Sequence, residues 1–168
     1  MDLQCILNAE DPMEEQVVEA LKVRGLTLTT AESCTGGLLA GTLINVAGIS
    51  DLFNEGYITY ANASKEKILG VRRETLDNEG AVSEMCAREM AMGAVKASGA
   101  RASLAVTGSA GPGGGTEEKP VGLVYVGCHY KGRTIAKRFQ FKGNRQKIRE
   151  QTTQYALVTA WKMMKGLE

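Results

Sequence analysis

Residues 26–37 read LTLTTAESCTGG. The first five of these residues are rich in β-branched threonine, which favours a strand, and residues 38–48 (LLAGTLINVAG) have the apolar spacing of a helix. The sequence therefore predicts a strand that runs directly into a helix, which is the repeating unit of α/β proteins. The turn between them lies where open α/β sheets usually bind their ligands.

Further elements are expected on both sides of this unit. Upstream, Asp11 should cap a helix whose first position is Pro12 and which stops at Gly25. Downstream, Ser83 should cap a helix that stops at Gly99. The other predicted elements are strands over residues 56–60, 103–107, 122–130 and 134–141, a short helix beginning near residue 61, and a final helix over residues 144–165. Because crossover units combine with one hairpin, we expect an α/β fold with a mixed, mostly parallel sheet and helices on both faces.

Length and composition agree with one compact domain. The chain has 168 residues, 43% of them hydrophobic and 23% charged, and these fractions are close to the averages for soluble globular proteins. Disordered, collagen-like and fibrous proteins are therefore excluded. Chains of this length usually form a single core, so we expect one domain over residues 1–168.

The charge balance and the apolar pattern limit the possible partners. There are 20 Lys and Arg against 19 Asp and Glu, a net charge of +1, whereas nucleic-acid-binding proteins usually carry a basic surplus. No apolar run approaches the roughly 18 residues that span a bilayer, and the N-terminal segment is acidic, unlike a signal peptide. We expect a cytoplasmic protein that binds neither nucleic acid nor membranes.

The cysteines and the single histidine exclude several kinds of site. Cys5, Cys34, Cys86 and Cys128 are scattered, with no CxxC pair, so we expect buried thiols and neither a disulfide framework nor a bound metal. His129 lies at the end of a predicted strand, beside a Lys-Gly turn. It should therefore lie at the rim of the sheet, which argues against catalysis by a histidine.

Two glycine-rich loops, each following a predicted strand, are the candidate ligand site. Residues 30–37 place exposed N–H groups at a helix start, where an anion or an oxyanion could bind, although Ser33 or Thr35 could simply cap the helix. Residues 108–116 (GSAGPGGGT) lack the Lys of a Walker loop and could also be a flexible hairpin. Together, the two loops suggest one crevice lined from two sides.

Basic residues offer a base and a phosphate ligand. Lys65 follows a strand end beside Tyr60 and Asn62, and it could act as a base if burial lowers its pKa, or it could be a solvated lysine. Arg145, in the basic stretch of residues 131–149, is best placed to reach a substrate phosphate. Cys34 has no partner that would form its thiolate, so a buried thiol is expected there.

Several motifs, in fixed order, carry a family resemblance. AESCTGG (31–37), GYITYAN with a Lys three residues later (56–65), GAVS (80–83) and TGSAGPGGGTEEKPVGLVYV (107–126) resemble the CinA C-terminal domain family, over nearly the whole chain. Stand-alone members, of the PncC type, are nicotinamide mononucleotide amidohydrolases. The resemblance implies an α/β domain that hydrolyses the carboxamide of nicotinamide mononucleotide (NMN) to nicotinate mononucleotide and ammonia, without a metal or other cofactor.

The resemblance also implies a set of site residues. The expected catalytic residues are Ser33, Ser50, Tyr60 and Lys65. The expected substrate-binding residues are Glu32, Thr35, Gly36, Asn62, Thr107, Gly108 and Arg145. The chain departs from the usual family pattern at Ile49 and Ser109, and neither change removes a proposed catalytic group.

A serine activated by a neutral lysine can hydrolyse an amide without any histidine. Because Ser33 could be committed to capping, we expect Ser50 to be the nucleophile and Ser33 to relay or orient it. The alternative is a catalytically silent nucleotide-binding or interaction domain. A homodimer or other homo-oligomer is also expected, because a short sheet with a hairpin edge is often paired or covered.

Overall fold

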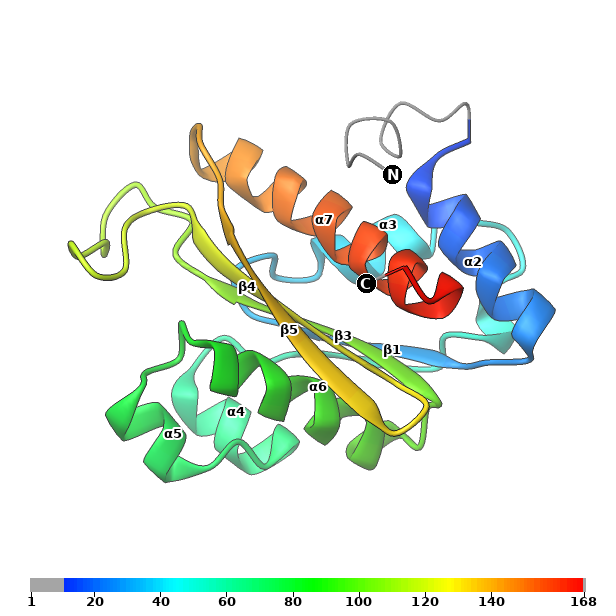
Figure 1. The fold of residues 1–168 in the computed structure, drawn as a ribbon, viewed down its shortest axis with the longest axis horizontal. Coiled ribbons are helices and arrows are strands. Elements are labelled where there is room, and N and C mark those ends of the chain that lie inside the picture. The colour runs from blue at the N-terminus through cyan, green and yellow to red at the C-terminus, as the bar shows by residue number, and fades with distance from the viewer. Residues whose placement is uncertain (1–10, 168) are drawn as a thin grey trace.

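A computed structural model describes residues 11–167 (Figure 1). The helices are α2 (Met13–Arg24), α3 (Leu38–Leu43), α4 (Asn62–Leu69), α5 (Arg73–Asn78), α6 (Glu84–Ser98) and α7 (Arg145–Lys165), with a 3-10 turn, η1 (Ile49–Asp51). The strands are β1 (Leu28–Glu32), β2 (Gly56–Ile58), β3 (Ala102–Gly108), β4 (Leu123–Tyr130) and β5 (Arg133–Gln140).

The five strands form one mixed sheet in the order β2-β1-β3-β4-β5. Strand β1 pairs in parallel with β2 and β3, whereas β3 with β4 and β4 with β5 are antiparallel. The expectation of a mostly parallel sheet was therefore wrong, because the parallel and antiparallel pairs are equal in number. The physical reason is that no helix separates β3, β4 and β5, and parallel neighbours require a crossover connection.

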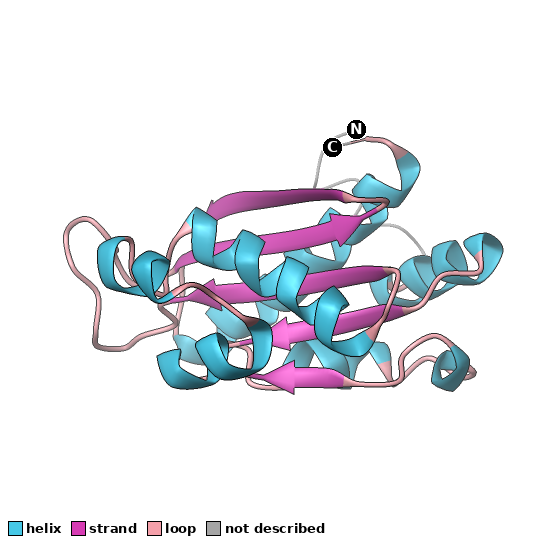
Figure 2. Cartoon of the chain, turned by 90° about the horizontal axis from the view of Figure 1, so that it is seen from below, coloured by secondary structure: helices cyan, strands magenta, loops and turns pink. Residues whose placement is uncertain are grey.

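Helices cover both faces of the sheet, as predicted. Helices α2, α3 and α7 lie on one face, and α4, α5 and α6 lie on the other (Figure 1). Figure 2, viewed from the side of α4, α5 and α6, shows the strands of the single sheet behind these helices.

Alternation along the strands separates two hydrophobic clusters. In β3, Leu104 and Val106 pack in the cluster beneath α2, α3 and α7, while Ala105 packs in the cluster beneath α4 and α6. The residues facing α6 are small, and the Ser103 hydroxyl donates a hydrogen bond to the Ala91 carbonyl of that helix, at 2.6 Å. Helix α6 therefore lies close to the backbone of the sheet.

Several element boundaries differ from the predicted ones for local reasons. Helix α2 begins after Pro12 and has no side-chain cap, so the expected capping by Asp11 was wrong. Strand β1 starts at Leu28 because the Leu26 N–H bonds to the Leu21 carbonyl, which closes the end of α2 around the left-handed Gly25. Helix α3 is shorter than the predicted residues 38–48 and ends at Leu43.

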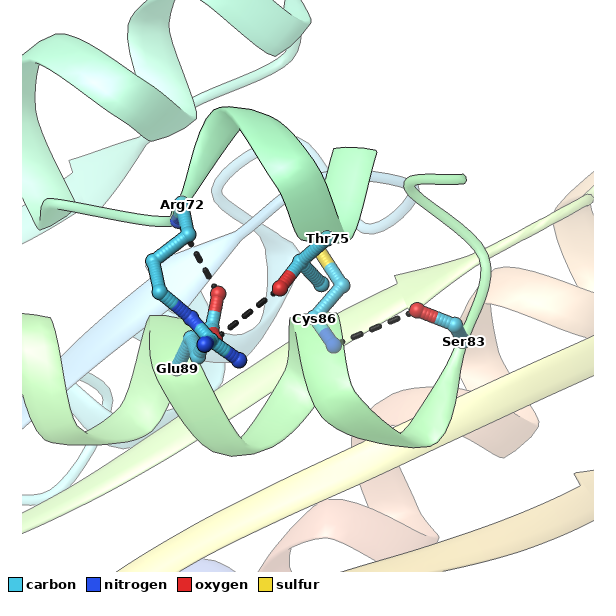
Figure 3. A network of polar contacts seen from close by, with 5 residues as sticks. All are labelled: Arg72, Thr75, Ser83, Cys86 and Glu89. Atoms are coloured by element: carbon cyan, nitrogen blue, oxygen red, sulfur yellow. Dashed lines mark hydrogen bonds and ion pairs between the residues drawn. The ribbon is translucent and has the colours of Figure 1, made fainter. Parts of the chain in front are cut away.

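Helix α5 was not predicted, and contacts from α6 hold it in place. The Glu89 carboxylate accepts hydrogen bonds from the Arg72 backbone N–H at 3.0 Å and from the Thr75 hydroxyl at 3.0 Å, and it forms an ion pair with the Arg72 guanidinium (Figure 3). On the same helix, the Ser83 hydroxyl accepts from the Cys86 N–H, which confirms the predicted cap (Figure 3). A carboxylate from another helix thus holds the start of α5, which is too short to be stable alone.

Replacement of Gly93 tests the packing of α6 on α4. A Cβ atom at Gly93 would lie 1.8 Å from the Leu69 carbonyl oxygen, so Gly93→Ala must push the helices apart. We expect it to lower the free energy of unfolding by about 1–3 kcal/mol in urea titrations. The control is Gly41→Ala on α3, where a Cβ meets nothing within 4 Å and alanine should be neutral or stabilising by up to ~1 kcal/mol. Equal effects of the two changes would contradict this packing.

Candidate active site

One pocket of about 260 Å³ gathers many of the expected site residues at the carboxyl ends of the parallel strands. Its walls come from the turn after β1, the segment between β2 and α4, the loop after β3 and the start of α7. Among the residues that line it are Ser33, Tyr60, Lys65, Thr107, Gly108 and Arg145. The crevice expected between two glycine-rich loops is therefore present.

Lys65 lies at the back of this pocket and is 1% exposed. Its ammonium nitrogen donates to the Thr59 carbonyl at 2.7 Å, the Tyr60 carbonyl at 3.1 Å and the Ser33 Oγ at 3.1 Å. The reading of Lys65 as a solvated helix residue is thus wrong. It forms no ion pair with any carboxylate of residues 11–167.

Burial lowers the pKa of Lys65 from its ordinary value, because the charged ammonium loses its hydration. In the neutral form, the amine keeps two N–H donors and gains a lone pair. The two backbone carbonyls accept those donors, so the lone pair is directed at the third partner, Ser33. The geometry therefore suits a lysine that accepts a proton from the Ser33 hydroxyl.

Cys34 is adjacent to Ser33 but is not suited to act as a nucleophile. Burial raises the pKa of its thiol to about 11, so the reactive thiolate is scarce near neutral pH. Cys34, Cys86 and Cys128 are all buried thiols, as predicted, and Cys5 lies outside the described residues. Of the two side chains at this turn, the serine is the one with a base beside it.

Tyr60 and Arg145 meet at the pocket's edge. Tyr60 is 62% exposed, and its hydroxyl accepts a hydrogen bond from an Arg145 Nη at 3.2 Å. The other Nη of Arg145 donates to the Gly111 carbonyl at 2.8 Å. The guanidinium of Arg145 therefore lies at the edge of the same pocket that Ser33 and Lys65 line.

Thr107 and Gly108 shape the pocket through the backbone. The Thr107 hydroxyl donates to the Ala81 carbonyl at 2.7 Å, which ties the segment before α6 to the end of β3. A Cβ at Gly108 would lie 2.7 Å from the Leu123 carbonyl oxygen, so only glycine lets β4 pair so closely there. Both residues thus hold the backbone segments that form this side of the pocket.

Ser50 is not in the pocket. It is exposed on η1, in the segment whose Leu52 and Glu55 carbonyls bond to Leu28 and Thr29 at the start of β1. Ser33 and Lys65 lie beyond the other end of that strand, roughly 15 Å away at about 3.3 Å per residue. This separation from Lys65 does not support the expected role of Ser50 as the nucleophile.

Glu32 also has a different task from the one expected. Its carboxylate is buried and accepts hydrogen bonds from the N–H groups of Gly37, Leu39 and Ala40, at 2.8–3.1 Å. It thus caps α3 from within the sheet and does not line the pocket. The N–H groups of Gly37, Leu39 and Ala40 are therefore occupied and are not available to an oxyanion.

Three more expected ligands do not line the pocket. Thr35 is buried, and its hydroxyl has no hydrogen-bond partner among residues 11–167. Gly36 supplies a left-handed backbone conformation, with φ of 59°. Asn62 is exposed at the first position of α4.

His129 lies where the sequence placed it, far from the pocket. It pairs with Ser103 near the start of β3, whereas the pocket lies beyond the end of that strand. Its Nδ1 is 2.6 Å from the Thr134 hydroxyl oxygen.

Two groups of potential importance were missed by sequence reasoning. Arg149 donates from Nε to the Cys34 carbonyl at 3.1 Å and from Nη2 to the Thr35 carbonyl at 2.5 Å, and so clamps the turn after Ser33. The N–H groups of Ala110 and Gly111, on the opposite wall, have no hydrogen-bond partner within the described chain. The only available signal for Arg149 was its position one turn after Arg145 on the same helix.

Residues 11–167 contain no group of three or more His, Cys, Asp or Glu side chains arranged to hold a metal ion. None of the helices in this part of the chain is long and apolar enough to cross a bilayer.

Residues 10–164 match the family model described as the CinA C-terminal domain. A putative competence-damage inducible protein of Clostridium perfringens is 57% identical over 143 residues, covering 85% of this chain. That match covers 35% of the relative, so the chain spans about a third of its length.

Solved structures resemble the chain over most of its length. The competence/damage inducible protein CihA from Agrobacterium tumefaciens is 41% identical, with a TM-score of 0.84, covering 95% of this chain and 98% of that one. The competence damage-inducible protein A from Klebsiella pneumoniae is 37% identical, with a TM-score of 0.89, covering 93% and 97%.

The lowered pKa of Lys65 predicts a pH dependence of stability. The window lies between the lowered pKa of Lys65 in the folded protein and about 10.5, the pKa of an ordinary lysine. At a pH in this window, Lys65 is mostly neutral in the folded protein and mostly protonated in the unfolded chain. Because the unfolded chain binds more protons, the contribution of Lys65 to the free energy of unfolding increases as pH rises. We expect the free energy of unfolding of the native protein, minus that of Lys65→Met, to increase with pH across this window in urea titrations. A difference independent of pH would contradict the lowered pKa.

Proposed function

The chain belongs to the CinA C-terminal domain family, and we propose that it hydrolyses the carboxamide of NMN to nicotinate mononucleotide and ammonia. The substrate is taken from the family resemblance. The mechanism rests on one observation, the contact between Ser33 Oγ and the buried Lys65 nitrogen at 3.1 Å.

Ser33 is the proposed nucleophile, in place of Ser50. The expected objection was that Ser33 would be occupied in capping α3, but Glu32 caps that helix instead. The Ser33 hydroxyl is therefore available to Lys65. Ser50 lies near the opposite end of β1, away from Lys65.

The proposed reaction has two stages. Neutral Lys65 takes the hydroxyl proton while Ser33 Oγ attacks the carboxamide carbon, and the C–N bond then breaks as Lys65 returns the proton to the departing ammonia. This leaves an ester on Ser33. Lys65 next takes a proton from water, the resulting hydroxide attacks the ester, and the proton returns to Ser33 as nicotinate mononucleotide leaves.

Two other parts of the pocket suit the rest of the substrate. The unpartnered N–H groups of Ala110 and Gly111 can stabilise negative charge, either on the carbonyl oxygen during attack or on the substrate phosphate. Arg145, at the rim and at the start of α7, is the proposed phosphate ligand. In this arrangement the pyridine ring and the ribose span the distance between Arg145 at the rim and the Ser33–Lys65 pair.

The first test is ammonia release from NMN in the presence of a chelator. We expect turnover that is insensitive to the chelator, because the proposed nucleophile and base are both side chains. Ser33→Ala should lower kcat by about 10³-fold or more, whereas Ser50→Ala, its matched control, should retain native kcat. Loss of activity in Ser50→Ala alone would restore Ser50 as the nucleophile.

The second test concerns the base. Lys65→Ala should lower kcat by about 10²- to 10⁴-fold while NMN binds with similar affinity, since its phosphate lies at the other end of the pocket. Lys65→Arg should be equally inactive, because a guanidinium does not give up its proton. The native pH–rate profile should rise with a group titrating below ~10.4. Near-native turnover in either variant would rule out the Ser-Lys mechanism.

A catalytically silent nucleotide-binding or interaction domain is the alternative. NMN binding by calorimetry, without ammonia release from folded protein, would favour it. The homo-oligomer expected from the sequence stays a prediction.

A further inference from the structure

We propose that Arg149 is the positioning residue of the nucleophile, acting through the backbone of the turn that follows Ser33. This inference rests on the proposed role of Ser33. Arg149 does not line the pocket, and its guanidinium approaches the turn from α7.

The turn needs an external support because its own sequence gives little rigidity. Gly36 and Gly37 both have left-handed backbone conformations, with φ of 59° and 96°, and glycine has the widest conformational freedom of all residues. On the strand side, the Ser33 N–H is held by the Val106 carbonyl at 3.0 Å. On the helix side, Glu32 holds the Gly37 N–H at 2.9 Å.

Arg149 holds the segment between those two anchors. Its Nε and Nη2 donate to the carbonyls of Cys34 and Thr35, which belong to the two peptide units that begin one residue after Ser33. Each peptide unit is planar, so a fixed carbonyl also fixes the N–H on its other side. The backbone is therefore constrained from one peptide unit beyond Ser33, and the Val106 carbonyl holds the Ser33 N–H on the other side. Together these contacts keep the Ser33 Oγ within reach of Lys65.

The chemistry of the guanidinium suits this task. Its donors lie in one rigid plane, so two of them can reach two successive carbonyls, which a single ammonium cannot do with the same geometry. Arg149 forms no ion pair with a carboxylate of residues 11–167. Within residues 11–167, its side-chain hydrogen bonds all go to this turn.

Arg149→Ala is the test variant. A displacement of the nucleophile of about 1 Å can cost ~10²-fold in rate, so we expect kcat for NMN to fall by about 10- to 100-fold while KM changes little. Guanidinium ion at a non-denaturing concentration should raise kcat of Arg149→Ala several-fold by refilling the site. Arg149→Lys should give an intermediate kcat.

Arg24→Ala is the matched control. Arg24 also donates to two backbone carbonyls, those of Ala20 and Met164, each at 3.0 Å, but it lies away from the pocket. Arg24→Ala should lower the thermal midpoint and retain native kcat, with no response to guanidinium.

A readout independent of NMN separates this inference from the proposed function. The rate at which phenylmethanesulfonyl fluoride modifies Ser33, followed by mass spectrometry, should fall at least several-fold in Arg149→Ala. If native protein is modified at Ser33 but releases no ammonia, the substrate is wrong and the slower labelling still supports the role of Arg149. The inference is overturned if Arg149→Ala keeps the native kcat and the native labelling rate. It is also overturned if kcat and labelling of Arg149→Ala fall only in proportion to the fraction of folded protein and guanidinium does not restore them. Absence of Ser33 labelling in the native protein would overturn it as well.

Discussion

The candidate site depends on the burial of one amine. A lysine that is 1% exposed must either find acceptors for its protons or lose one of them, because an uncompensated ammonium is costly away from water. Here two backbone carbonyls and one hydroxyl surround it. Both carbonyls belong to the segment that joins β2 to α4, so the parallel pairing of β1 with β2 brings base and nucleophile together.

How much of this could be predicted depends on the range of the interactions involved. The strand-turn-helix unit, the Ser83 cap and the position of His129 follow from local patterns, and they were found. Helix α5 was missed because the carboxylate that holds its start, Glu89, belongs to another helix. The prediction that most strand pairs would be parallel was wrong. The sequence already implied antiparallel pairs, because no helix lies between the last three strands, β3, β4 and β5.

The site shows the same division. Motif order brought Ser33, Tyr60, Lys65, Thr107, Gly108 and Arg145 into consideration, and they line one pocket. The choice of Ser50 over Ser33 as nucleophile could not be tested from the sequence, because it depended on whether the Ser33 side chain caps α3. That question is decided by Glu32, whose carboxylate reaches donors five to eight residues further along the chain. Arg149 acts across more than 110 residues, a separation at which periodicity and propensity give no information.

Strand alternation explains how a carboxylate can adjoin the nucleophile without disturbing its base. Successive side chains of a strand point to opposite faces. In β1, Leu28 packs beneath α2, α3 and α7, and Ala31 packs beneath α4 and α6. Glu32 accordingly points to α3, and Ser33, the next residue, points to Lys65 on α4.

A carboxylate facing Lys65 would favour the charged form of the lysine and raise its pKa. By directing that charge to three N–H groups on the other face, the sheet leaves burial as the dominant influence on the lysine, and a neutral amine becomes accessible beside the serine.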